Sequence, residues 1–214
     1  SEQDNYNELS SVPLEQVDST SLIFSAQNLL NNGELDKAEF LLIKAARKDP
    51  DNANIFLQQG YLNNLKNNNS AANDLFNQAL EKDPSLNAAE TLLVMNYIKQ
   101  KDFSKALEVA NTIKDSKPEL SKTLFGKIYI EKGDLLLAKE TFEELLTMNG
   151  ENAGTLFKLG QIAELNKDIS SAVSYFQQAF KISSNIPIVT SSLMKYSTNE
   201  AYKENIELFL LARV

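Results

Sequence analysis

One stretch of sequence decides the fold. Residues 53–86 read ANIFLQQGYLNNLKNNNSAANDLFNQALEKDPSL. In the first half of this stretch, Phe56, Gly60 and Asn63 share one face at helical spacing. Gly60 has no side chain, so a second helix can approach its backbone closely, and Ala72 supplies a matching small residue. The stretch therefore predicts two amphipathic helices joined by a short turn.

The small residues of this stretch recur along the chain. Five alanines are separated by 34, 34, 32 and 34 residues, namely Ala38, Ala72, Ala106, Ala138 and Ala172. Three glycines each lie twelve residues before one of these alanines, namely Gly60, Gly126 and Gly160. Three prolines keep the 34-residue period, namely Pro50, Pro84 and Pro118. A fixed period of this length indicates an array of stacked helix pairs, in which each pair contacts only its neighbours.

This pattern resembles the tetratricopeptide repeat, whose period is 34 residues and whose second helix carries A-x3-F before a proline. The matching residues are Ala38–Leu42–Pro50, Ala72–Phe76–Pro84, Ala106–Ala110–Pro118, Ala138–Phe142–Gly150 and Ala172–Phe176–Ser184. The resemblance implies an all-α fold, a right-handed α-α superhelical solenoid of helix-turn-helix repeats. We expect an acidic tail at residues 1–18. Five repeats follow, at residues 19–52, 53–86, 87–118, 119–152 and 153–186. Residues 187–214 are expected to form a degraded sixth repeat or capping helices.

The sequence departs from the family pattern in the middle repeats and at the end. The family's tryptophan is replaced there by Glu90 and Lys122. The interval from Ala106 to Ala138 is two residues short, and the spacing from Pro118 to Gly126 places this deletion in the turn between repeats 3 and 4. We expect a joint between two subarrays there, or a first helix of repeat 4 that begins two residues late. The last unit stops at Val214 before it is complete. Either the natural protein continues, or this end caps the solenoid or forms a homodimer.

Composition excludes several kinds of site. The 214 residues contain no Cys and no His, which excludes disulfides, thiolate metal sites and His-based catalytic triads. The net charge is −8, but seven acids precede the first base, Lys37, and the remaining chain has 22 acids against 21 bases. No basic stripe, glycine-rich phosphate loop or membrane-length apolar run is present. We therefore expect no enzymatic activity, cofactor, metal, nucleic acid or membrane span.

The resemblance also implies a binding groove. In the family, the second, fifth, ninth and twelfth residues of each repeat line a concave surface that takes an extended or helical peptide. The groove residues expected here are Ile23, Gln27, Asn54, Leu57, Tyr61, Thr91, Met95, Thr123, Lys127, Phe157 and Gln161. They are mostly neutral or apolar, with Lys127 nearly the only cation, which predicts an apolar or amphipathic protein segment as ligand. An edge of the array or its convex face is the alternative surface.

One subtype of the family binds the C-terminal carboxylate of heat-shock chaperones through lysines and asparagines. The fifth place of each repeat carries no lysine here, so this function is not expected. The acidic tail instead offers apolar residues, namely Tyr6, Leu9, Val12, Leu14 and Val17. We expect the tail to pack on the first repeats or to lie in a neighbouring molecule's groove.

The repeats predict a non-enzymatic scaffold for protein–protein interaction. A non-catalytic module of a larger enzyme or of an export-assembly protein is the alternative, and a homodimer through the C-terminal edge is a third interpretation. Residues 105–146 resemble bacterial tetratricopeptide lipoproteins of exopolysaccharide and protein-sorting export systems, which favours the periplasm or cell envelope slightly over the cytoplasm. The chain begins at Ser1 without Met or a signal peptide, so a processed or shortened chain is expected.

Overall fold

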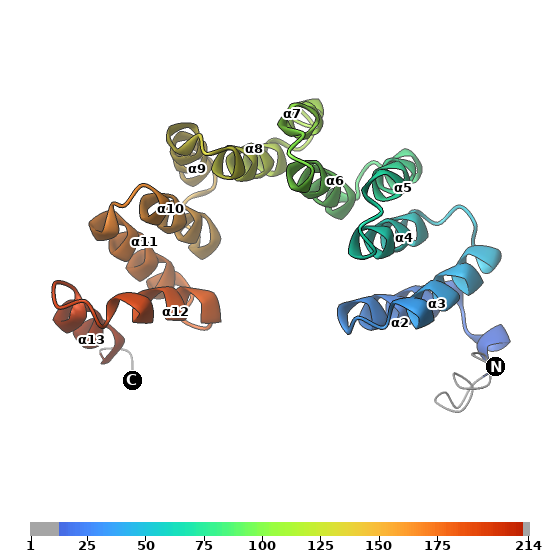
Figure 1. The fold of residues 1–214 in the computed structure, drawn as a ribbon, viewed down its shortest axis with the longest axis horizontal. Helices are drawn as coiled ribbons and strands as arrows, with labels where there is room; N and C mark the ends of the chain where they lie inside the picture. The colour runs from blue at the N-terminus through green and yellow to red at the C-terminus, as the bar shows by residue number, and fades with distance from the viewer. Residues whose placement is uncertain (1–12, 212–214) are drawn as a thin grey trace. The chain divides into compact units, whose positions relative to one another are not determined.

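The computed structural model describes residues 13–211, and every regular element in that range is helical (Figure 1). A short 3-10 helix, η1 (Leu14–Gln16), precedes the α-helices. The α-helices are α2 (Ser19–Asn31), α3 (Leu35–Lys48), α4 (Ala53–Leu65), α5 (Asn69–Lys82), α6 (Asn87–Lys99), α7 (Phe103–Thr112), α8 (Pro118–Lys132), α9 (Leu135–Asn149), α10 (Ala153–Leu165), α11 (Ile169–Ile182), α12 (Pro187–Tyr196) and α13 (Lys203–Leu211).

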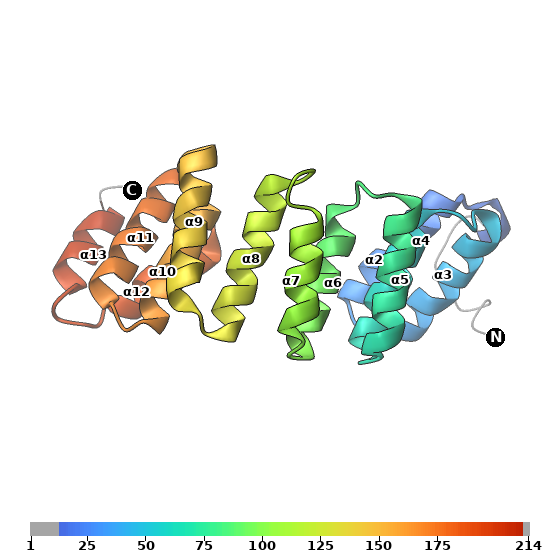
Figure 2. The same ribbon diagram turned by 90° about the horizontal axis from the view of Figure 1, so that it is seen from above.

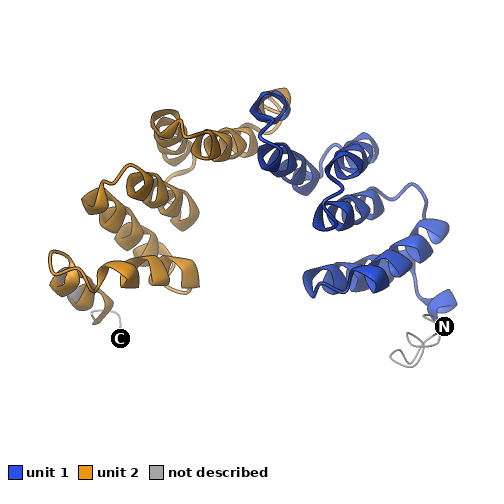
Figure 3. Ribbon diagram, viewed as in Figure 1, with its two compact units in different colours: residues 1–109 blue, residues 110–214 orange. Residues whose placement is uncertain are grey.

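The chain divides into two compact units, residues 1–109 and 110–214, and the division falls inside α7 (Figure 3). Within each unit, consecutive helices pack as pairs: α2 with α3, α4 with α5, α8 with α9, and α10 with α11. The second helix of a pair also contacts the first helix of the next, as α3 contacts α4 and α9 contacts α10. The predicted all-α fold of repeated helix pairs is therefore confirmed.

A residue in the left-handed region reverses the chain between the two helices of each pair. These residues recur at the period of the sequence, with φ between 60° and 87°, namely Gly33, Asn67, Lys101, Gly133 and Lys167. In two of these turns an aspartate then caps the following helix. Asp102 accepts a hydrogen bond from the Lys105 amide at 3.1 Å, and Asp168 accepts one from the Ser171 amide at 3.1 Å. These caps fix where α7 and α11 begin.

Glycine in the first helix makes room for an aromatic ring from the second. A methyl group on Gly60 would lie 2.6 Å from the ring of Phe76, and Gly126 and Gly160 have the same relation to Phe142 and Phe176. The three rings are buried. The close approach at Gly60 thus depends mainly on this ring, rather than on the alanine that the sequence pattern indicated.

The predicted deletion in the turn before α8 is wrong, because residues 113–117 separate α7 from α8, whereas only 83–86 separate α5 from α6. The chain is shortened instead in the second helix of the third pair. Helix α7 has ten residues, whereas α5 and α11 have 14 each. The first helix of the next pair does not begin late, because α8 starts at Pro118, eight residues before Gly126. That expectation was wrong. At the end of α7, the buried Ser121 hydroxyl donates a 2.7 Å hydrogen bond to the carbonyl oxygen of Ala110 and so satisfies a helix-end acceptor.

The described part of the N-terminal tail packs on the first helix pair. Leu14 is only 2% exposed and belongs to a core cluster with Leu22 and Ile23. Val17 packs against the same cluster, and Lys48 donates a hydrogen bond to the carbonyl oxygen of Glu15. The other apolar residues of the tail lie outside the described residues, namely Tyr6, Leu9 and Val12.

At the other end, the chain covers its own apolar residues. Ile206 of α13 is fully buried in a cluster with residues of α10, α11 and α12. Phe209 and Leu210 pack against that cluster, with the Phe209 ring centroid 5.6 Å from that of Phe180. Val214 lies outside the described residues. Ile206, Phe209 and Leu210 therefore do not require a second molecule, and the homodimer stays a prediction.

Candidate functional site

The first helices of three successive pairs in residues 1–109 surround a hollow of about 480 Å³. Figure 2 shows these helices, α2, α4 and α6, behind α3 and α5. The lining residues are Gln27 and Asn31 from α2, Leu57, Gln58 and Tyr61 from α4, and Asn87, Ala88, Thr91 and Leu92 from α6. The hollow thus lies on the helices whose side chains were expected to form a groove.

Four of the predicted groove residues lie together around this hollow, namely Gln27, Leu57, Tyr61 and Thr91. The prediction missed Gln58 and Leu92, which occupy the sixth place of their repeats. Helical spacing was the available signal, because Gln58 lies three residues before Tyr61 and therefore shares its face. It also missed Asn31 and Asn87, whose places the family pattern does not include.

The hollow is uncharged, because none of its lining residues is acidic or basic. Within residues 13–211, the side-chain amides of Gln27, Asn31, Gln58 and Asn87 and the Tyr61 hydroxyl form no hydrogen bond. Gln58 is only 8% exposed. No side-chain atom of Gln58 is both buried and without a partner, so its amide keeps access to the hollow. The hollow therefore offers donors and acceptors that the described chain leaves available to a ligand.

The other predicted residues of this unit have different surroundings. Ile23 is 9% exposed and belongs to the core of the first pair. Asn54 is exposed in the first turn of α4, and Met95 is 49% exposed one turn after Thr91. Only Met95 therefore adds a large exposed apolar side chain on the helix that carries Thr91.

In residues 110–214, the predicted groove residues come from α8 and α10. Phe157 is a core residue, 9% exposed, with its ring centroid 5.5 Å from that of Phe176. Gln161 is partly exposed, and its side-chain oxygen accepts a 2.8 Å hydrogen bond from Lys158. Thr123 is partly exposed and donates a hydrogen bond to the carbonyl oxygen of Glu119. This part of the predicted site is thus engaged by contacts within the chain.

Lys127 has a second cation beside it. Burial lowers the pKa of Lys158, the charge of Lys127 lowers it further, and Glu131 acts in the opposite direction. The description of Lys127 as nearly the only cation was therefore incomplete. Lys158 occupies the sixth place of its repeat, as Gln58 and Leu92 do, and was missed for the same reason.

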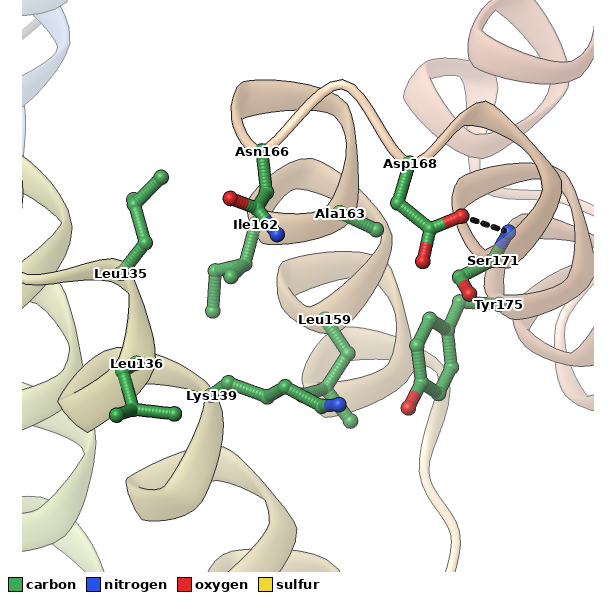
Figure 4. A pocket seen from close by; sticks show the side chains of 10 residues that line it. All are labelled: Leu135, Leu136, Lys139, Leu159, Ile162, Ala163, Asn166, Asp168, Ser171 and Tyr175. Carbon is green, nitrogen blue, oxygen red and sulfur yellow. Dashed lines mark hydrogen bonds between the residues drawn. The ribbon is translucent and has the colours of Figure 1, made fainter.

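A smaller hollow of about 220 Å³ lies among α9, α10 and α11, and none of the predicted groove residues lines it. Leu135 and Leu136 lie on one side of it, with Asp168 and Tyr175 on the other (Figure 4). Its acidic residue, Asp168, already caps α11, as the dashed line to Ser171 shows. This hollow is therefore a weaker candidate than the uncharged one.

Within residues 13–211, no cluster of carboxylates suited to holding a metal ion is found. The helices of this range are also too short or too polar to cross a bilayer.

The family model of the tetratricopeptide repeat matches residues 25–87 and 123–185, more than half of the chain. The chain belongs to the tetratricopeptide repeat family. Comparison with curated proteins gives no match. Tetratricopeptide repeats bind proteins or peptides and are generally non-catalytic, so membership supports a scaffold for protein–protein interaction.

Solved tetratricopeptide repeat proteins have the same fold. A thermophilic protein of this family from Thermus thermophilus has a TM-score of 0.66 at 13% identity, with 82% of this chain and 99% of that chain covered. PilF of Pseudomonas aeruginosa has a TM-score of 0.61 at 14% identity, with 91% and 97% covered. PilW has a TM-score of 0.61 at 15% identity, with 90% and 98% covered. At these identities the likeness shows the fold alone.

Proposed function

We propose that this tetratricopeptide repeat protein is a non-enzymatic scaffold that holds a segment of a partner protein against α2, α4 and α6. The observation that supports this proposal most is the uncharged hollow, whose side-chain amides and Tyr61 hydroxyl form no hydrogen bonds within the described chain. Its apolar lining, Leu57, Ala88 and Leu92, suits an apolar side chain of the partner. Gln27, Tyr61 and Thr91 surround the same space and complete the proposed binding surface.

The proposal is tested with the full chain as bait and the Tyr61→Ala variant beside it. Partners retained by the wild type are identified, purified and titrated against both proteins. We expect Tyr61→Ala to weaken binding about tenfold or more, because truncating a central tyrosine of an interface commonly costs about 1.4 kcal/mol or more.

The matched control is Tyr175→Ala, which removes a tyrosine from the smaller hollow. It should leave the affinity unchanged, and circular dichroism should show both variants to be helical. Equal affinity of wild type and Tyr61→Ala for every partner would remove this hollow as the binding surface.

A module of an export-assembly protein is the second candidate function. One protein of the same fold, PilW, is characterised as a widely conserved type IV pilus biogenesis factor, and this shared fold supports the alternative. Fractionation of native cells tests it, since an envelope location is expected. Recovery of the protein in the cytoplasmic fraction alone would exclude this interpretation.

A homodimer through the C-terminal edge is a further proposal. Ile188, Met194 and Leu211 remain more than half exposed in α12 and α13, and exposed apolar residues support an interface there. Light scattering at two concentrations should then show a mass that increases with concentration. A constant monomer mass would exclude the dimer.

A further inference from the structure

The smaller hollow, among α9, α10 and α11, lies where the fifth repeat has an unusually small residue. Ala163 lines this hollow and stands three residues after Gly160, at the eleventh place of its repeat. The other four repeats have larger residues at that place, namely Leu29, Asn63, Tyr97 and Tyr129. The hollow is therefore space that a larger side chain of the chain itself fills in other repeats.

The third and fourth repeats show what fills this space. The rings of Tyr97 and Tyr129 pack there against buried core clusters. The Lys105 ammonium lies 5.6 Å from the centroid of the Tyr97 ring, and Lys105 immediately precedes the periodic alanine of its repeat. Ser171 has the same place in the fifth repeat, and it lines the hollow. The hollow thus has the surroundings that an aromatic ring has in the third repeat.

The size and the walls of the smaller hollow suit a ring that enters from solvent. Its volume is about 220 Å³, and an apolar cavity of about 150 Å³ is enough to bind benzene. Leu159 and Ile162 give it an apolar, almost fully buried wall. Leu136 also lines it and is 70% exposed, so the chain does not close the hollow. A ring that entered would cover Leu136 as well as the buried wall.

Charge complementarity favours a neutral aromatic ring over a charged or an aliphatic group. Lys139 and Asp168 line the hollow with opposite charges, and Asp168 is already bonded to Ser171. The Lys139 ammonium is 3.7 Å from a Glu143 carboxylate oxygen and can also face the negative surface of a ring. Figure 4 shows the Tyr175 ring on the side opposite Leu136, where a second ring could pack against it.

We propose that the smaller hollow is a second docking site, which takes an aromatic side chain of a partner polypeptide. The two hollows share no lining residue, and neither proposal requires the other. Tyr175→Ala therefore remains the control for the uncharged hollow.

The experiment titrates the full chain with p-cresol, the side chain of tyrosine, and with its saturated counterpart 4-methylcyclohexanol. NMR follows the backbone amide signals of Ala163, Asn166 and Ser171. We expect p-cresol to shift these signals and to bind about threefold more tightly than the saturated ligand, in keeping with a contact between a cation and a ring. The blocked pentapeptide acetyl-Gly-Gly-Tyr-Gly-Gly-amide should shift the same signals.

Ala163→Tyr is the variant that isolates the inference, because it fills the hollow with a ring of the chain itself, as in the third and fourth repeats. It should weaken p-cresol binding about tenfold or more, whereas its thermal midpoint should not fall. Lys139→Met removes the charge and should bring the affinities of p-cresol and 4-methylcyclohexanol together. Leu136→Ala should weaken p-cresol binding, and the matched control is Leu137→Ala, since Leu137 is exposed but does not line the hollow.

Several outcomes would overturn this inference. Equal affinity of p-cresol and 4-methylcyclohexanol for the wild type would remove the preference for a ring. Binding of p-cresol without binding of the pentapeptide would show that the hollow admits a free phenol and not a polypeptide. If Ala163→Tyr failed to fold, the exposed Leu136 would still decide, because equal affinity of Leu136→Ala and Leu137→Ala would place the ligand elsewhere.

Discussion

Three phenylalanine rings occupy the space that glycine leaves in the facing helix of the same pair. The tightest contact is in α10 and α11, where a methyl group on Gly160 would lie 2.4 Å from the ring of Phe176. The third pair has valine and alanine at these two places, Val94 and Ala110, and both are fully buried. The larger residue of the two stands in the first helix there, the reverse of the order in the other pairs.

The first prediction is that Gly160→Ala destabilises the fold by about 2–3 kcal/mol, because the added methyl group overpacks a buried ring. Urea unfolding followed by circular dichroism measures the change. The control lies on the same helix: a methyl group on Gly154 would have only one neighbour, the Asn152 side-chain oxygen at 3.5 Å. Gly154→Ala should be neutral or stabilising by up to about 1 kcal/mol. Equal effects of both changes would contradict the packing argument.

Two lysines have a backbone conformation that suits glycine better. Lys101 has φ of 60° and Lys167 has φ of 62°, at the places where Gly33 and Gly133 stand in other repeats. A side chain in the left-handed region costs roughly 1–2 kcal/mol. We therefore predict that Lys101→Gly and Lys167→Gly each stabilise the protein by about 1 kcal/mol. Gly33→Ala should destabilise the protein for the same reason. The denaturant midpoints of the three variants test the expected stabilisation and the expected destabilisation.

At the scale of elements, a buried polar contact lies between α5 and α6. The Asn96 side chain is fully buried and donates hydrogen bonds to the Asn69 carbonyl oxygen at 2.9 Å and to the Asn73 side-chain oxygen at 2.7 Å. Its own side-chain oxygen has no partner within the described chain. Three other repeats have apolar residues at this place, namely Leu62, Ile128 and Ile162. The asparagine therefore gains little that an apolar side chain would not supply.

The Asn96 side chain has partners for its nitrogen but none for its oxygen, and this gives a prediction for the α5–α6 contact. Asn96→Leu alone should be neutral or destabilising by about 1 kcal/mol, because it leaves the Asn73 oxygen without its donor. Asn73→Leu combined with Asn96→Leu should be more stable than either single variant. A double-mutant cycle from urea unfolding measures the coupling, and additive effects would show that the contact carries no coupling energy.

The segment η1 covers one side of the first helix pair. We predict that Leu14→Ala destabilises the protein by about 2–4 kcal/mol, the cost of removing a buried leucine side chain. Leu136→Ala is the control, since Leu136 is 70% exposed and its loss should change stability little. Thermal unfolding of both variants compares them. A small effect of Leu14→Ala would mean that the tail merely lies on the repeat without stabilising it.

For the whole molecule, capping aspartates link stability to pH. Hydrogen bonds from Ser21 lower the pKa of Asp18, those from Lys105 lower the pKa of Asp102, and those from Ser171 lower the pKa of Asp168, all below the ordinary value of 3.8. Because the folded pKa is the lower one, the stabilisation is present above about pH 4 and is lost as the pH falls through the folded value.

The prediction is that Tm falls between about pH 7 and about pH 3, and that replacing all three aspartates by asparagine makes this fall smaller. Asparagine caps helices about as well as aspartate, so the variant should match the wild type near neutral pH. Scanning calorimetry at the two pH values provides the measurement. An equal fall in both proteins would place the acid sensitivity in other carboxylates.

The sequence by itself determined the fold, because a 34-residue period of small residues is compatible with few structures other than stacked helix pairs. The spacing of Gly60, Ala72 and Phe76 was informative, since helical neighbours lie at fixed offsets along the chain. The left-handed turns were likewise predictable from Gly33 and Asn67. Lys101 and Lys167 gave a weaker signal, because lysine disfavours the left-handed conformation that they have at these helix ends.

Only the tertiary structure decided which predicted groove residues lie together. Sequence places Ile23, Leu57 and Phe157 at one repeat position. All three are buried core residues, but only Leu57 also lines one of the two hollows described above. The repeat pattern contained no reason to choose Gln58, because an amide on a helix surface is ordinary until neighbouring helices form a hollow beside it. Burial, and the absence of a partner within the described chain, are properties of helices packed in three dimensions, which no spacing along a single helix contains.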